Sequence, residues 1–187
     1  MNATATATVN PSAASTHDEA ADYIWNNSFD KPTLVISRAR VGVQYDALQA
    51  GLGDARIHYA VKANPAPEVI RMLVERGSGF DAASRQEIEL CLSQGADPAK
   101  ISFGNTIKRG VDIAFAHSIG VTMFAADCEA ELDKIAEHAP GARVYIRLIV
   151  ENSMADWPLT RKFGCAGSLL PSLLEYTKSV GLVPYGL

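Results

Sequence analysis

The sequence predicts an α/β fold with parallel strands, and a (β/α)8 TIM barrel fits it better than a doubly wound sheet does. Strand-like and helix-like segments alternate from residue 57 to the end of the chain, which is typical of parallel α/β folds. Polar residues stand at the ends of successive strands at regular spacing: Lys62, Asp81, Asn105, Asp127 and Arg147. A doubly wound nucleotide-binding sheet would also need a Gly-x-Gly-x-x-Gly run after its first strand, and the sequence has none.

The elements follow in a simple order. A disordered tail and a short helix are expected within residues 1–30, followed by a strand over 33–37 and a helix over 40–52. Further strands are expected over 57–61, 78–80, 100–103, 121–125 and 143–149, and helices over 67–76, 84–93, 108–118, 128–138 and 168–179. A sixth strand begins near Leu182. A barrel needs eight βα units, so we expect a partial barrel domain over 31–187, truncated after about five units.

Composition and charge exclude several classes of protein. The 187 residues are 48% hydrophobic and 20% charged, with a net charge of −4 and no basic run, which argues against nucleic acid as a partner. No apolar run approaches the roughly 20 residues of a membrane span. The three cysteines lie far apart without Cys-x-x-Cys spacing, so neither a metal site nor a disulfide framework is indicated. A cytoplasmic location is therefore expected.

Lys62 is the first candidate for chemistry. The strand that precedes it is stopped by the run Asn64-Pro65-Ala66-Pro67, because proline cannot extend a strand ladder. Lys62 would therefore lie at the carboxyl end of a strand, where active sites of parallel α/β folds collect. We expect it to be partly desolvated, which would lower its pKa and favour imine formation. The alternative is an ordinary surface lysine.

Three further residues are candidates at the same edge. Asp81 would end the next strand, where a carboxylate could stabilise a protonated imine, although it could instead cap the following helix. Ser84 and Glu87 have the spacing of a capping box, so a cap is at least as good an interpretation of Glu87 as a binding role. Arg147 lies on the fifth expected strand and is a candidate for the site. The alternative interpretation is that Arg147 forms a buried ion pair that takes no part in the chemistry.

Three runs of sequence resemble the fold-type III pyridoxal-phosphate (PLP) decarboxylases, whose barrel is of the alanine racemase type. The runs are Tyr59-Ala60-Val61-Lys62-Ala63-Asn64-Pro65, Gly79-Phe80-Asp81-Ala82-Ala83-Ser84 and Lys162-Phe163-Gly164-Cys165. The resemblance covers 31–187 and is strongest to ornithine decarboxylases, including the bacterial ornithine/lysine type. Single-barrel PLP-carrier proteins also use a lysine at a strand end, but the three runs fit the decarboxylases better.

The resemblance implies PLP as cofactor, with Lys62 as the lysine that holds it and Asp81, Glu87 and Arg147 near the cofactor. It implies a homodimer that decarboxylates ornithine or lysine to a diamine such as putrescine, in polyamine biosynthesis. The family's stacking histidine, phosphate-binding loop, pyridine-facing glutamate and C-terminal β-domain would follow residue 187. We therefore expect negligible activity from the chain alone. The alternative is a non-catalytic homologue that binds a full-length decarboxylase subunit.

Overall fold

A computed structural model describes residues 19–150 and 162–187. The expected tail at the N-terminus and most of the loop over 150–162 lie outside the described residues. The chain divides into two compact units, one ending at Gly53 and the other beginning at Asp54.

The first unit contains two helices, α1 (Glu19–Trp25) and α2 (Arg38–Leu52). Helix α2 begins at Ser37, whose hydroxyl oxygen accepts a hydrogen bond from the Arg40 backbone N–H at 3.3 Å. The strand expected over 33–37 is wrong, because this segment has no strand partner among the described residues. Leu34 in its middle is 83% exposed, and an extended segment needs a neighbouring strand for its backbone groups.

The second unit is built on one six-stranded parallel sheet. Its strands are β1 (His58–Ala60), β2 (Gly79–Ala82), β3 (Ile101–Phe103), β4 (Met123–Ala126), β5 (Arg143–Ile146) and β6 (Val183–Gly186). They pair in the order in which they occur in the chain. This sequential order is that of a barrel, whereas a doubly wound sheet reverses direction at a switch point. The five βα units and the sixth strand are confirmed.

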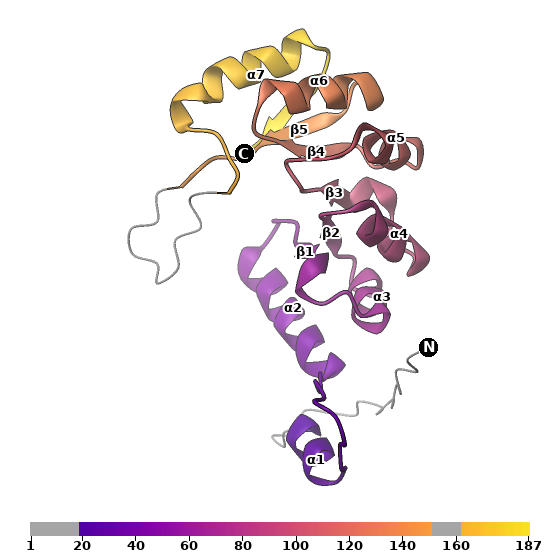
Figure 1. Ribbon diagram of the computed structural model, residues 1–187. Coiled ribbons are helices and arrows are strands. Elements are labelled where there is room, and N and C mark those ends of the chain that lie inside the picture. The colour runs from indigo at the N-terminus through magenta and orange to yellow at the C-terminus, as the bar shows by residue number, and fades with distance from the viewer. Residues whose placement is uncertain (1–18, 151–161) are drawn as a thin grey trace. The chain divides into compact units, whose positions relative to one another are not determined.

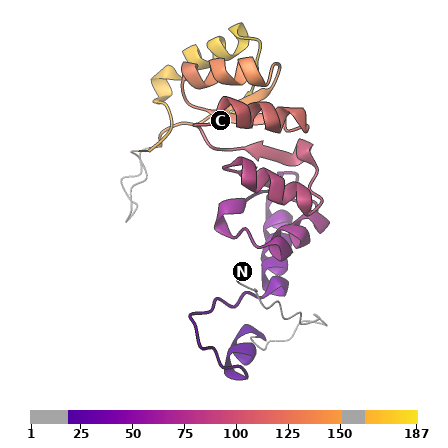
Figure 2. The same ribbon diagram turned by 45° about the vertical axis from the view of Figure 1, so that its right-hand side comes forward.

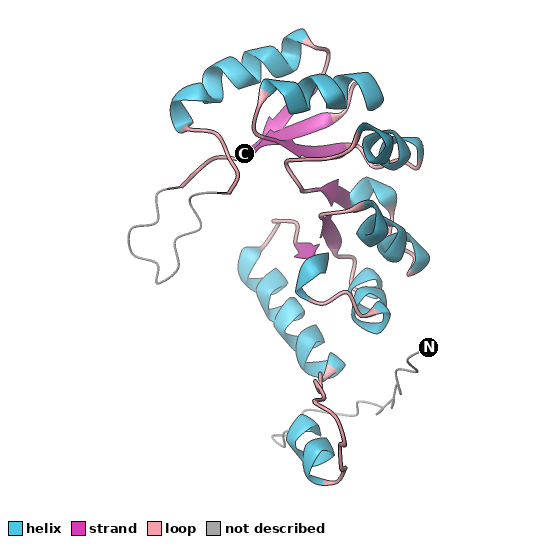
Figure 3. Ribbon diagram, in the orientation of Figure 1, coloured by secondary structure: helices cyan, strands magenta, loops and turns pink. Residues whose placement is uncertain are grey.

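Five helices connect the strands of this unit. They are α3 (Pro67–Glu75), α4 (Arg85–Ser93), α5 (Gly110–Ser118), α6 (Glu129–His138) and α7 (Leu170–Ser179). All five lie on the same side of the sheet, as Figures 1 and 2 show. Figure 3 separates the strands from these covering helices by colour. No helix in the described part of the chain is long and apolar enough to cross a membrane.

The core lies between the sheet and these helices. Its largest fully buried side chains come from both layers: Phe80, Ile101 and Phe124 from strands, and Ile70, Leu73, Ile88, Ile113, Leu132 and Ile135 from helices. Side chains alternate between the two faces of a sheet along each strand. Because the apolar side chains are buried on the face that the helices cover, polar side chains can lie on the opposite face. The opposite face is therefore the place to look for a site.

The backbone around Lys62 differs from the expectation. Strand β1 ends at Ala60, and Val61–Ala63 forms a short 3-10 turn, so Lys62 lies in a turn rather than at the last position of a strand. The Asn64 side-chain oxygen accepts from the Ala66 backbone N–H at 3.0 Å, which makes an Asx turn. The Tyr59 hydroxyl donates to the Asn64 carbonyl at 3.3 Å. These bonds hold the segment that carries Lys62.

Candidate active site

Lys62 presents a free amine. Its side chain is exposed, so the partial desolvation expected for it is not found in this structure. No hydrogen bond or ion pair joins its amine to another residue within the two ranges that the structure describes. A primary amine that is exposed and has no ion-pair partner is accessible to an aldehyde for covalent attachment.

Asp81 lies inside β2, paired in register with Ala60, two residues before Lys62. The Ser102 hydroxyl donates to the Asp81 Oδ1 at 2.8 Å. Asp81 also touches the backbone of Gly104 closely, since a Cβ at that position would lie 1.9 Å from Oδ1. The alternative of Asp81 as a helix cap is not what the structure shows, because Ser84 is the N-cap of α4.

Tyr145 was not predicted as a site residue. Its phenol is half-buried and lies within electrostatic reach of Asp81 and Ser102. Burial raises the pKa of Tyr145 to about 12, and the negative charge of Asp81 adds to the increase. Tyr145 is therefore a neutral hydroxyl donor at physiological pH. Its place two residues before Arg147, on the same face of the strand expected over 143–149, was the signal that could have identified it.

Glu87 has the contacts of a capping residue. Its Oε2 accepts from the Ala83 backbone N–H at 2.6 Å, and its own N–H donates to the Ser84 hydroxyl oxygen at 3.3 Å. These reciprocal bonds satisfy backbone donors at the start of α4. The cap interpretation is thus confirmed, while a role toward a cofactor remains a prediction.

Arg147 directly follows β5, where its backbone N–H donates to the Ala126 carbonyl at 2.9 Å. Its guanidinium is exposed and lies 5.4 Å from the centre of the Phe163 ring. No ion pair of Arg147 is found among the described residues, so the buried ion pair considered as its alternative is not seen there. The chain near Phe163 is fixed by Asp127, whose Oδ2 accepts from the Gly164 N–H at 2.8 Å.

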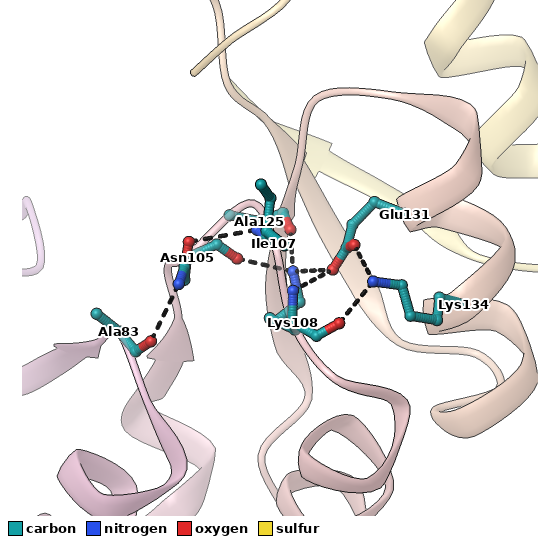
Figure 4. A network of polar contacts seen from close by, with 7 residues as sticks. All are labelled: Ala83, Asn105, Ile107, Lys108, Ala125, Glu131 and Lys134. Atoms are coloured by element: carbon teal, nitrogen blue, oxygen red, sulfur yellow. Dashed lines mark hydrogen bonds and ion pairs between the residues drawn. The ribbon is translucent and has the colours of Figure 1, made fainter. Parts of the chain in front are cut away.

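A second polar cluster was also not predicted. Lys108, in the loop between β3 and α5, is completely buried, and its Nζ donates to the carbonyls of Asn105 at 2.8 Å and Ala125 at 2.6 Å. It also pairs with the Glu131 Oε1 at 2.8 Å, while Lys134 pairs with Oε2 at 2.5 Å. Figure 4 shows Lys108 at the centre of these contacts.

Hydrogen bonds connect the cluster to the segment that follows β2. The Asn105 side-chain amide donates to the Ala83 carbonyl at 3.4 Å, and the Lys134 Nζ donates to the Lys108 carbonyl at 2.5 Å.

Burial lowers the pKa of Lys108, although Glu131 opposes this effect. All three donors of the Lys108 ammonium are used in hydrogen bonds or the ion pair. The Lys62 side chain, by contrast, has no such partner among the described residues. No group of three metal-ligating side chains occurs in the described ranges.

The second unit combines a parallel βα sheet with an exposed lysine in the turn after β1 and a carboxylate on β2, the strand that pairs with β1. These features fit the class of proteins that hold an aldehyde cofactor through a lysine. A family model of the pyridoxal-dependent decarboxylases, describing their pyridoxal-binding domain, matches residues 38–187. The chain belongs to this family, whose cofactor is pyridoxal phosphate.

Relatives and solved structures agree. A decarboxylase from Aspergillus flavus is 37% identical over 163 residues, covering 87% of this chain and 38% of that protein. A lysine/ornithine decarboxylase from Selenomonas ruminantium is 35% identical over 156 residues, covering 83% and 40%. A crystal structure of the decarboxylase SrLDC with PLP and cadaverine is 32% identical with a TM-score of 0.78, covering 90% of this chain and 42% of that one. The chain thus spans about two fifths of the length of these relatives.

Proposed function

We propose that this chain supplies the lysine-bearing part of a PLP-dependent decarboxylase that acts on a basic amino acid, ornithine or lysine, and releases a diamine such as putrescine. The observation that carries the proposal is the exposed, unpaired amine of Lys62, one strand away from the Asp81 carboxylate. The names of the relatives support the substrate class. A role in polyamine biosynthesis follows from that product.

The residues present fit the cofactor. Lys62 has the amine needed for covalent attachment, and Asp81 is a carboxylate held by Ser102 at the same edge. We assign Asp81 to stabilising positive charge beside Lys62. Glu87 and the exposed Arg147 are assigned to the surroundings of the cofactor. Once bound, PLP supplies the electron sink for the electrons left behind by the departing CO₂.

We further propose a homodimer in the cytoplasm for the complete assembly. The three cysteines are free thiols, which suits a reducing compartment. Strands β1 and β6 each pair on one side only among the described residues, so the sheet has two edges that further chain could extend.

The test is the attachment of PLP to the purified chain. The protein is mixed with PLP, reduced with borohydride and mapped by peptide mass spectrometry. We expect label on Lys62, which Lys62→Met abolishes and the exposed control Lys178→Met retains. Label spread over surface lysines in place of Lys62 would overturn the proposal. We expect negligible turnover of ornithine or lysine by the chain alone, and turnover that depends on Lys62 would refute that expectation.

A second candidate is a non-catalytic subunit that binds a full-length decarboxylase. The two sheet edges favour it, because unpaired strand edges are ready sites for association. Native mass spectrometry of the chain mixed with a full-length relative separates the two candidates. A stable mixed complex whose total activity survives Lys62→Met would favour the non-catalytic role.

A further inference from the structure

Asp81 and Ser102 are joined by a hydrogen bond across two neighbouring strands. They are register partners in the parallel pair of β2 and β3, and the Ser102 hydroxyl donates to the Asp81 Oδ1 at 2.8 Å. Only 4% of Ser102 is exposed, so solvent has little access to its hydroxyl. Because a buried hydroxyl without a partner is costly, the bond to Asp81 fixes the direction of both side chains.

Gly104 lies against the same carboxylate. A Cβ at this position would lie 1.9 Å from the Asp81 Oδ1 and 2.7 Å from its Cγ, so the acid occupies the space that a side chain would fill. The backbone of Gly104 is not among the glycines in the left-handed region, which means that its conformation would also suit alanine. The glycine is therefore explained by the room that it leaves for the acid.

The sheet fixes the backbone on both sides of Asp81. On one side the Gly104 N–H donates to the Ala82 carbonyl at 2.8 Å, which continues the pairing of β2 and β3. On the other side Asp81 pairs with Ala60, two residues before Lys62. The freedom left to the acid is rotation of its own side chain, and Ser102 and Gly104 restrict that rotation.

We propose that Ser102 is a positioning residue which, together with the bare backbone of Gly104, fixes the orientation of the Asp81 carboxylate beside the strand that leads to Lys62. The proposal rests on the proposed function insofar as it concerns PLP. An ionised carboxylate only accepts hydrogen bonds, so a donor on one oxygen holds its charge in one place. Fixed charge of this kind acts without reorganisation when a cation forms beside it. Ser102 acts through Asp81 and is assigned no contact with a reacting atom.

The first test measures PLP attachment at Lys62 in the full chain by borohydride reduction and peptide mapping. Ser102→Ala removes the donor and is expected to raise the PLP concentration for half-maximal labelling about tenfold. Ser118→Ala is the matched control, because its exposed hydroxyl also donates at 2.8 Å, but to the Phe115 carbonyl within α5. Equal half-maximal concentrations for the two variants would overturn the proposal.

A second comparison asks whether Ser102 acts through the acid. Ser102→Ala is made in a chain that already carries Asp81→Asn, where no carboxylate charge is left to orient. We expect it to cause little further change in labelling there, because residues that work through one contact are not additive. A tenfold effect that persists in the Asp81→Asn chain would show that the serine acts by another route, and would contradict the proposal.

A third variant moves the acid without removing the donor. Gly104→Ala places a methyl group where the Asp81 Oδ1 now lies, so the carboxylate must turn away from Ser102. We expect weaker labelling of Lys62 by a factor similar to that of Ser102→Ala. Gly167→Ala is the control, since a Cβ at Gly167 meets no atom within 4 Å. Labelling of Gly104→Ala that matches this control would count against the proposal.

The last measurement needs no PLP. Urea denaturation of the wild type, Ser102→Ala, Asp81→Asn and the double variant gives the coupling between the two side chains and shows that each variant is folded. The double variant is expected to lose less stability than the sum of the single losses, and purely additive losses would refute the contact. If wild-type Lys62 takes no label at all, the proposed function fails, while this cycle still decides whether Ser102 holds Asp81.

Discussion

Lys62 and Lys108 occupy comparable places in the fold, each in the loop that follows a strand, yet their surroundings are opposite. Lys108 is completely buried and uses all three ammonium donors. Lys62 is exposed, and its amine has no partner among the described residues. With the role proposed for Lys62, the difference teaches that burial and a lowered pKa do not by themselves identify the lysine that does chemistry. Here the buried lysine stabilises the fold and the exposed one is available for reaction.

The largest expected effect on stability comes from removing the buried Lys108 ammonium. Lys108→Met leaves the carbonyls of Asn105 and Ala125 without their donor and reduces the pairing of Glu131. We expect the free energy of unfolding to fall by about 3–5 kcal/mol, measured by urea denaturation. Lys62→Met is the control and should change stability by no more than about 0.5 kcal/mol. Equal effects of the two substitutions would contradict the comparison.

A smaller loss of stability is expected from changing Glu131, the acid that pairs with Lys108. Glu131→Gln removes the charge but keeps an oxygen that can accept one bond, so we expect a loss of about 1.5–3 kcal/mol. Glu131 raises the pKa of Lys108 against the effect of burial, so this pKa should fall further in the variant.

The sign of the pH dependence follows from that shift. Between the lowered folded pKa of Lys108 and its ordinary value of 10.5, the unfolded chain binds more protons than the folded one. Stability of the variant should therefore rise with pH in this window, and more steeply than in the wild type. Urea denaturation at neutral and mildly alkaline pH measures this slope. A variant that loses stability as the pH rises would show that burial does not control Lys108.

The smallest effect on stability is expected from the ion pair between Asp112 and Arg109, whose guanidinium lies at the surface. The exposed Arg109 donates to both carboxylate oxygens of Asp112, at 2.7 and 2.9 Å, and this pairing lowers the pKa of Asp112. Its contribution is present above the ordinary pKa of 3.8 and disappears as the pH falls through the lowered folded value. Asp112→Asn should thus be slightly less stable at neutral pH and equal to the wild type in acid. A difference that persists in strong acid would point to another cause.

Much of the fold could be predicted because its signals are local. Proline after Asn64, glycine after each helix and alternating apolar segments marked the βα units within a few residues of their observed bounds. The prediction of a strand over 33–37 was wrong. Its apolar residues match the pattern of a strand, but no neighbouring strand pairs with this segment among the described residues. A strand depends on a partner, and the sequence of one segment does not contain that information.

The site was predictable only where it depends on short motifs. Lys62, Asp81 and Glu87 were identified from strand ends and capping spacing, whereas Tyr145 and Lys108 were missed. Their surroundings come from residues far away in sequence, since the charge of Asp81 on β2 raises the pKa of Tyr145 on β5, and Lys108 pairs with Glu131 on α6. The exposure of Lys62 was missed for the same reason, because flanking residues say little about what covers an amine.

The turn that carries Lys62 has a thermodynamic consequence. Val61 is fully buried, and Asn64 is bonded both through its side chain to Ala66 and through its carbonyl to Tyr59. Folding has therefore already restricted the backbone on both sides of the amine. When a ligand is captured there, the remaining loss of conformational entropy falls on the side-chain torsions of Lys62, which is roughly 2 kcal/mol at most. A flexible loop in the same place would add about 1–2 kcal/mol for each residue that had to be ordered.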